Sequence, residues 1–341
     1  DVYKRQTLYS VLLLAVGTSW MPAAADNRHP VAIDWSRLDQ SCIDLSGYLD
    51  APAGKHGFIR AEGEHFVDDR GRRIRFWGVN LGGPSCFPSH QQAEQFAATL
   101  ARLGINGVRF HGLDSNWGRS SIDRRDGTTS KLDESNLERF DYLFDQLKRR
   151  GIYGNINLNT FRTYEHADGL PDHEDLGLGK WATHFHPRVI ELQQQYARDL
   201  LSHVNPYTGL RYAEDPAVMV VEIVNENSLI EGWFNWKLVG NNDGSRDTWS
   251  PLPVPYAREL NRQFNDWLVK NRDPRQIHAF RAEVGLAGDQ PLTLLAPNQF
   301  STASEERFAA DYEFIVSTER RFLSQMQRLI KQESGLKSML I

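Results

Sequence analysis

The sequence contains only two cysteines among its 341 residues, Cys42 and Cys86, so a disulfide scaffold cannot hold this fold together. One bridge between them stays open in an oxidising compartment, although the count favours two free thiols, and neither has the spacing of a metal ligand. Basic residues are scattered without a long run, and the formal net charge is −5. These features argue against a nucleic-acid or anionic-membrane binder. The 40% hydrophobic content is enough for a large buried core.

Three familiar site motifs are also missing. No glycine-rich phosphate turn follows a strand pattern, and no serine nucleophile elbow occurs. The loop at 165–175 contains two histidines but lacks the i, i+4 spacing of the helical zinc motif, so a charged loop over a cleft is the favoured interpretation. A metal-dependent hydrolase with a barrel fold would need His or Asp ligands at the ends of several strands. In this sequence only His111 stands at such a position. We therefore expect no cofactor and no metal.

Residues 1–25 have the layout of a secretory signal peptide. Lys4 and Arg5 precede an apolar run at 8–16, and three alanines at 23–25 precede Asp26. The run is far shorter than the roughly 20 residues of a membrane span, and we expect no later segment to cross a bilayer. We expect a secreted or periplasmic protein in which residues 26–56 form an irregular lead-in to a domain at 57–341. Because the sequence begins with Asp rather than Met, we also expect the true start to lie upstream.

The rest of the chain alternates between strand and helix patterns. A small hairpin is expected over residues 57–67, and after it come strands and helices whose starts carry capping signals. Those helix starts are marked by Ser89 with Gln92, by Ser135 with Glu138, and by Pro187. The strand patterns lie at 74–80, 107–111, 152–158 and 217–224. Such alternation predicts an α/β fold with a parallel sheet.

Two architectures fit this alternation, a (β/α)8 TIM barrel and a doubly wound sheet. The barrel is favoured because polar and aromatic residues follow every strand, as they do at the catalytic face of a barrel. Further helices are expected around 256–270 and at 305–332, and a fifth strand begins at 336, shortly before the sequence stops. We therefore expect a TIM barrel truncated after about the fifth strand, that is, a fragment.

The fourth strand pattern leads into the residues that we single out for chemistry. It is an apolar, β-branched run from Ala217 that ends abruptly in Asn225-Glu226-Asn227. A carboxyl group at the mouth of a buried strand can lose solvation on one side, which raises its pKa and suits it to general-acid catalysis. The neighbouring amide of Asn225 can donate to a substrate hydroxyl. The alternative for Glu226 is a solvated loop carboxylate.

Three strand ends together resemble those of clan A glycoside hydrolases, and most closely the cellulase-like members of glycoside hydrolase family 5. The stretches that carry the resemblance are Phe-Trp-Gly-Val-Asn at 76–80, Val-Arg-Phe-His at 108–111 and Glu-Ile-Val-Asn-Glu at 222–226. The resemblance implies retaining hydrolysis of O-glycosidic bonds in a β-linked polysaccharide or oligosaccharide, with two carboxyl groups about 5 Å apart. It implies roles for three residues: Glu226 as the acid/base, Asn225 as the partner of the sugar 2-hydroxyl, and Arg109 as the cation beside the second carboxylate.

The same resemblance places His111 and Asn80 beside the cleavage point. It also places the nucleophile, a Glu, at the end of a seventh strand that these 341 residues do not contain. We therefore expect the parent enzyme to be active and this fragment to be inactive. Two alternatives stay open: Arg109 simply pairs with Glu222, and His111 is a satisfied core histidine.

Aromatic rings can pack on the C–H faces of sugars while polar groups bind the hydroxyls, so the expected partner is a carbohydrate. Aromatic residues follow the strand ends in this sequence, namely Phe87, Trp117, Phe161, Tyr164, Trp233 and Trp236. We expect one or two of them to stack on the substrate, Trp233 first, and we also count Trp117 among the binding residues. A non-catalytic glycan-binding barrel is the alternative from a different functional class.

Overall fold

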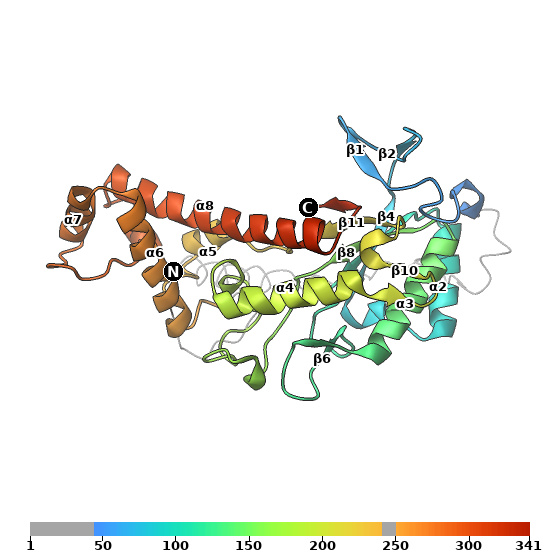
Figure 1. Ribbon diagram of the computed structural model, residues 1–341, viewed down its shortest axis with the longest axis horizontal. Helices are drawn as coiled ribbons and strands as arrows, with labels where there is room; N and C mark the ends of the chain where they lie inside the picture. The colour runs from blue at the N-terminus through green and yellow to red at the C-terminus, as the bar shows by residue number, and fades with distance from the viewer. Residues whose placement is uncertain (1–43, 241–249) are drawn as a thin grey trace, which may run out of the picture. The chain divides into compact units, whose positions relative to one another are not determined.

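The computed structural model describes residues 44–240 and 250–341 (Figure 1). These residues belong to one unit of the chain, residues 38–341. The predicted signal peptide, the first part of the predicted lead-in and Cys42 lie outside the described residues.

A five-stranded parallel sheet forms the centre of the described fold (Figure 1). Its strands run in the spatial order β12-β11-β8-β5-β4, and each pairs in parallel with its neighbour. They are β4 (Gly78–Gly82), β5 (Gly107–His111), β8 (Tyr153–Asn157), β11 (Val218–Glu222) and β12 (Met339–Leu340). Taken in chain order, each strand of this sheet lies on the same side of the strand before it. A doubly wound sheet reverses its strand order at a switch point, so that alternative does not apply to this sheet.

Helices connect the successive strands, as the alternation predicted. They are α2 (His90–Arg102), α3 (Glu134–Arg149), α4 (Pro187–Ser202) and, before the last strand, α8 (Glu305–Arg328). The capping box of Ser89 and Gln92 is confirmed, and so is Pro187 in the first turn of α4. The predicted box of Ser135 with Glu138 is wrong. The cap of α3 is Asp133, whose carboxylate accepts a hydrogen bond of 2.8 Å from the backbone N–H of Asn136.

The two faces of the sheet differ in chemistry because side chains alternate along each strand. One face is apolar and packs under the helices: Phe110 lies 4.8 Å from the ring of Phe140, and both are fully buried. Gly154 leaves room for this packing, since a Cβ at this position would lie 2.7 Å from Cε2 of Phe144. The other face carries the polar residues that form the site described below.

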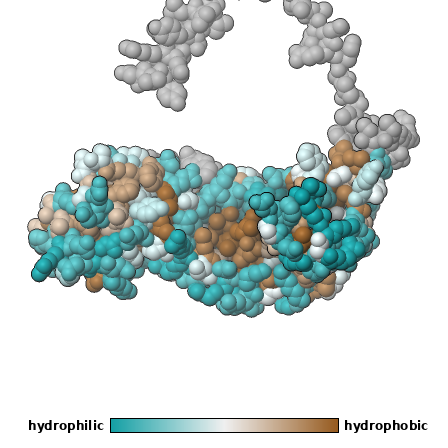
Figure 2. Space-filling view, turned by 90° about the horizontal axis from the view of Figure 1, so that it is seen from above, coloured by the Kyte–Doolittle hydropathy of each residue, from teal (hydrophilic) through white to brown (hydrophobic). Residues whose placement is uncertain are grey.

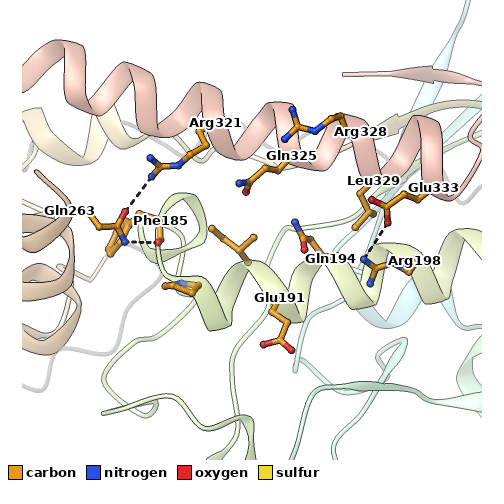
Figure 3. Close-up of a pocket in the computed structure, with 12 residues that line it drawn as sticks. Phe185, Glu191, Gln194, Arg198, Gln263, Arg321, Gln325, Arg328, Leu329 and Glu333 are labelled. Atoms are coloured by element: carbon orange, nitrogen blue, oxygen red, sulfur yellow. Dashed lines mark hydrogen bonds and ion pairs between the residues drawn. The ribbon is translucent and has the colours of Figure 1, made fainter. Parts of the chain in front are cut away.

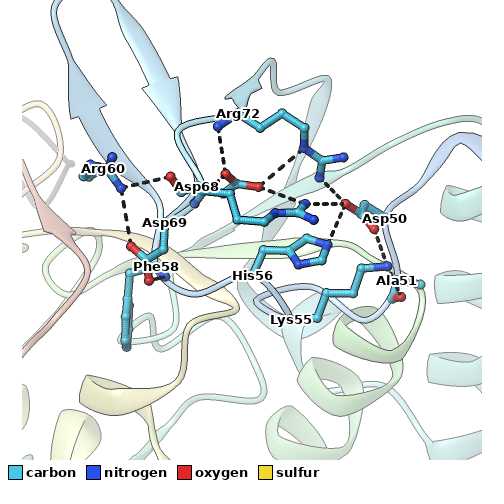
Figure 4. Close-up of polar contacts among 10 residues, drawn as sticks. Asp50, Ala51, Lys55, His56, Phe58, Arg60, Asp68, Asp69 and Arg72 are labelled. Carbon is cyan, nitrogen blue, oxygen red and sulfur yellow. Dashed lines mark hydrogen bonds and ion pairs between the residues drawn. The ribbon is translucent and has the colours of Figure 1, made fainter.

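A three-stranded antiparallel sheet precedes the parallel one and contains β1 (Arg60–Glu62), β2 (His65–Val67) and β3 (Arg73–Ile74). The predicted hairpin is therefore confirmed, but the predicted strand at 74–80 is split. Ile74 pairs with Phe66 of β2, and the chain enters the parallel sheet only at Gly78. An ion-pair network ties this small sheet to the preceding segment (Figure 4). Asp50 contacts Lys55, His56, Arg70 and Arg72, while the buried Asp68 contacts Arg70 and Arg72.

A helical excursion separates β11 from β12. It comprises α5 (Leu229–Phe234), α6 (Val254–Asn271), α7 (Pro274–Glu283) and α8, followed by a π turn at Leu329–Glu333. These helices pack around a second hydrophobic core, to which buried residues from the segment 164–192 also belong. From the excursion it includes Trp233, Tyr256, Leu260, Phe264, Phe280 and Phe314. The sequence predicted α6 and α8 but missed α7, which begins with a capping box at Asp273.

The remaining short elements connect these parts. Two-stranded ladders join β6 (Ile122–Asp123) to β7 (Lys131–Leu132) and β9 (Val204–Asn205) to β10 (Leu210–Arg211). In the face of the molecule seen from above, hydrophobic surface gathers midway along the length, between hydrophilic regions (Figure 2). Within residues 44–240 and 250–341, no helix combines the length and the apolar character needed to cross a bilayer.

Candidate active site

The polar face of the parallel sheet brings residues from separate strands into register. Asn80 of β4 pairs with Arg109 of β5, and Arg109 pairs with Asn155 of β8. Two residues further along, Asn157 pairs with Glu222 of β11. Because the side-chain period of a strand is two, all five side chains point to the same face of the sheet.

Glu222 is the centre of a hydrogen-bonded cluster on this face. Arg109 binds it in bidentate fashion, with Nε donating to Oε1 at 2.7 Å and Nη2 donating to Oε2 at 2.5 Å. The amide nitrogens of Asn155 and Asn157 donate to the same two oxygens at 2.6 and 2.7 Å. Burial alone would raise the pKa of Glu222, but the hydrogen bonds from Arg109 and Asn155 outweigh it and lower that pKa. Glu222 is therefore an ionised, fully engaged carboxylate, and the pairing of Arg109 with Glu222 that the sequence left open is present.

Arg109 also orients two of the predicted site residues. Its Nη2 donates to the side-chain oxygen of Asn225 at 2.9 Å, and its Nη1 lies 2.9 Å from Nδ1 of His111. A guanidinium only donates, so Nδ1 of His111 accepts and the proton of the neutral ring lies on Nε2. Burial, and then the charge of Arg109, lower the pKa of His111, which favours this neutral form. Asn225 accepts through its oxygen, which leaves its amide N–H groups as donors for a ligand.

Glu226 lies four residues beyond Glu222, the last residue of β11, in a turn rather than on the strand. Its φ of +46° is in the left-handed region, which is unusual for a residue with a side chain. The side chain is exposed, so the expected loss of solvation on one side is not seen. Its negative charge favours the protonated forms of Arg109, His111 and Lys180, so the carboxylate lies within electrostatic range of these three groups.

Two residues that carry no sequence signal support this turn. Lys180 is 3% exposed, and its ammonium donates to the carbonyl oxygens of Asn225 at 2.7 Å and Glu226 at 3.4 Å. His184 is fully buried, and its Nε2 lies 2.9 Å from the side-chain oxygen of Asn227. Burial lowers the pKa of His184 to about 4, so the ring is neutral. Neither residue belongs to a recognisable motif, since both lie in the irregular segment that precedes α4.

The aromatic residues predicted to stack on a sugar differ in their exposure to solvent. Trp117 is 54% exposed and its ring centre lies 4.3 Å from that of Phe161, which in turn lies 5.0 Å from His111. Trp117 and Phe161 therefore extend the polar cluster with flat apolar surface. The prediction for Trp233 is wrong: the side chain is 1% exposed and its indole N–H donates to the carbonyl oxygen of Leu295 at 2.6 Å, so it offers no face to a ligand. Phe87 and Tyr164 are also buried.

The charged loop at 165–175 is anchored by a buried carboxylate. The carboxylate of Asp168 is fully buried and accepts hydrogen bonds from Thr128 and from both the backbone and the side chain of Thr129, at 2.8–2.9 Å. In the part of the chain that the structure describes, no group of three or more His, Cys, Asp or Glu side chains is arranged to hold a metal ion.

Two cavities lie outside the polar cluster. The first, of about 540 Å³, separates α4 from α8 (Figure 3). It is lined by Arg198, Arg321, Arg328, Gln194, Gln263, Gln325 and other residues, none of which is a predicted site residue. The second, of about 720 Å³, is lined by residues of α3, α4 and the neighbouring ladders, among them Glu134, Glu138, Asp141, Asp199 and His203.

No protein-family model and no curated protein matches the chain. Among solved structures, it is similar to an endo-1,4-β-mannanase from Rhizomucor miehei, with 20% identity over 63% of this chain and 59% of that chain, at a TM-score of 0.41. A glycoside hydrolase family 5 mannosidase from the same organism is 18% identical over 53% and 51% of the two chains, at a TM-score of 0.39. A β-glucanase from Saccharophagus degradans is 18% identical over 72% and 56%, at a TM-score of 0.33. The chain thus spans between half and three-fifths of the length of these proteins.

Proposed function

We propose that the chain is part of a (β/α)8 barrel glycoside hydrolase that cleaves a β-linked glycan, with Glu226 as the proton donor. In this role the carboxyl group of Glu226 protonates the glycosidic oxygen as the bond to the anomeric carbon breaks, and later removes a proton from the attacking water. Asn225 binds the 2-hydroxyl of the sugar, and His111 and Asn80 contact the same ring. Trp117, together with Phe161, supplies a surface for a neighbouring sugar.

The observation that carries the proposal is the hydrogen bond from Arg109 to Asn225 beside an exposed Glu226. It fixes which end of the Asn225 amide faces the ligand, because the oxygen is occupied and the N–H groups are left to donate. The carboxylate of the next residue is open to solvent, and the neutral His111, which is bound to the same Arg109, offers its Nε2–H as a second donor for a hydroxyl group. Convergent donors beside a free carboxyl group, at the carboxyl end of a parallel sheet, are what acid-assisted cleavage of a sugar requires.

Retaining cleavage also needs an ionised carboxylate about 5 Å from the acid. Glu222 is ionised, but both of its oxygens are engaged by Arg109 and an asparagine, so it is a poor nucleophile. We propose that the nucleophile comes from a strand outside this sequence and that the chain by itself binds sugar without cleaving it.

A non-catalytic glycan-binding barrel is the second candidate. The same engagement of Glu222 favours it, because the described residues then offer one free carboxylate at the site rather than two. Both candidates share export across a membrane, which the N-terminal pattern predicts and which detection of a processed N-terminus in a secreted or periplasmic fraction would test.

The deciding experiment compares the 341-residue chain, its full-length gene product and their Glu226→Gln variants on β-glucans, β-mannans and aryl glycosides. We expect binding by all forms and cleavage only by the full-length protein, whose cleavage of unactivated substrates depends on an intact Glu226. The loss in the variant should be at least about a hundredfold on unactivated substrates. The matched control is Glu306→Gln, an exposed glutamate of the first turn of α8. Binding without cleavage by the intact full-length protein would favour the second candidate, and the absence of binding would refute both.

A further inference from the structure

The turn that presents Glu226 is held from several sides. The backbone N–H of Asn225 donates to the carbonyl oxygen of Asn159 at 2.9 Å, and Asn227 is bound by His184. The side chain of Glu319, on α8, accepts from Ser228 and from backbone N–H groups at the start of α5. A left-handed φ at a residue with a side chain costs free energy, so such a turn persists only where its surroundings impose it.

Lys180 is the support that reaches the strained residue itself. Its ammonium donates to the carbonyl oxygens of Asn225 and Glu226, which belong to the two peptide units on either side of the left-handed residue Glu226. Burying an ammonium group in this way is costly unless it is paired, and here carbonyl oxygens and the nearby charge of Glu226 compensate for the lost water. A neutral side chain of the same length would fill the space but could not hold either carbonyl.

The chain before Lys180 is shaped to deliver this side chain. Gly179 has a φ of +57°, and a Cβ there would lie 2.7 Å from Cε2 of the Tyr164 ring. Tyr164 is itself buried, so the ring has little room to move. Only glycine adopts this φ freely and fits this close approach without displacing the ring, and the next residue is Lys180.

We propose that Lys180 is a positioning residue for Glu226, which holds the left-handed turn and so fixes the direction of the Glu226 carboxylate beside Arg109 and His111. This inference rests on the proposed function only in giving Glu226 the role of the acid. The geometric part, that the turn depends on the ammonium, stands apart from any catalysis. The alternative is that Lys180 only stabilises the fold, in which case its removal would lower stability without a specific effect on the turn.

The first test is structural and uses the 341-residue chain. NMR chemical shifts of residues 225–228 are compared between wild type, Lys180→Met and the matched control Lys270→Met, which changes an exposed lysine of α6. We expect shift changes concentrated at residues 225–228 in Lys180→Met and none there in Lys270→Met. A folded Lys180→Met variant with an unaltered turn would overturn the inference.

A reciprocal measurement covers the case in which Lys180→Met does not fold. The pKa of the Lys180 ammonium is followed by NMR in wild type and in Glu226→Gln, where the change is at an exposed side chain. Burial lowers the pKa of Lys180 and the charge of Glu226 opposes this, so we expect a further fall in Glu226→Gln. An unchanged titration would mean that the two groups are not held together, and it would equally overturn the inference.

The functional test uses the leaving group of the substrate, in the full-length protein. A misplaced acid slows the cleavage of poor leaving groups, which need a proton, by up to about a hundredfold, while good leaving groups are affected much less. We expect this split in kcat for Lys180→Met, with little change in KM. Equal losses on all substrates would indicate a merely structural role. If the intact protein cleaves no glycoside, the proposed function fails, and the two NMR measurements still decide the part played by Lys180.

Discussion

Arg109 and Glu222 form a bidentate ion pair across the parallel sheet, with donor–acceptor distances of 2.7 and 2.5 Å. The two residues lie on β5 and β11, which are separated by β8, and Asn155 and Asn157 of that middle strand donate to the same carboxylate. The pair therefore joins three strands through one charged group. The pair also positions two residues of the candidate site, because the same guanidinium contacts Asn225 and His111.

The Arg109–Glu222 pair should be much more sensitive to the loss of one partner than to the loss of both. Glu222→Gln leaves a largely buried guanidinium without its counter-charge, and we expect it to lower the free energy of unfolding by about 2–4 kcal/mol. Combining it with Arg109→Met should cost less than the sum of the single changes, as urea denaturation of all three variants would reveal. Strict additivity would show that the two side chains act independently, contrary to the structure.

Much of the fold, though less of the site, could be predicted from the sequence. Strand β5 matches its pattern to the residue, and helix α2 begins where its cap predicts, since an apolar run bounded by Gly107 and a capping box at Ser89 are local signals. The cap of α3 was misassigned because Ser135-x-x-Glu138 matches the same signal as a true box. What decides is the hydrogen bond to Asp133, which the sequence does not display.

Site residues were predictable where strand alternation determines their direction. Arg109, His111 and Glu222 follow the period of two, so their common face could be foreseen. Trp233 was misjudged because its burial depends on Phe300 and Phe308, which lie far along the chain on the helical excursion. Lys180 was missed because a single lysine in a glycine-containing loop gives no periodic signal.

His184 should make the protein less stable in mild acid. The pKa of the buried ring is lowered to about 4, whereas an unfolded histidine titrates near 6.5. Between these values the unfolded state binds more protons than the folded state, so stability is lost as the pH falls from about 6.5 to about 4. One unit of pKa corresponds to about 1.4 kcal/mol, so the full effect is about 3 kcal/mol.

The measurement is the free energy of unfolding as a function of pH for wild type, His184→Gln and the control His278→Gln, an exposed histidine of α7. The loss of stability between pH 6.5 and 4 should be smaller in His184→Gln than in the other two proteins. Parallel curves for all three would mean that His184 is accessible to protons in the folded state.

Gly154 should not tolerate a methyl group. A Cβ at this position of β8 would lie 2.7 Å from Cε2 of Phe144 and 3.0 Å from Cε2 of Phe110, both of which are buried rings. We expect Gly154→Ala to lower the free energy of unfolding by about 1–3 kcal/mol through overpacking. Gly47→Ala is the control, since a Cβ there meets nothing within 4 Å. Equal stability of the two variants in thermal or urea denaturation would contradict the packing of this face.

The most direct measurement of the central claim, that Glu226 donates the proton, is the dependence of cleavage rate on the leaving group in the full-length protein and its Glu226→Gln variant. The account predicts that the variant retains cleavage of aryl glycosides with good leaving groups and loses at least about a hundredfold on poor ones, because only the latter need an acid. A variant that cleaves both classes as well as the intact protein does would contradict the assignment of Glu226.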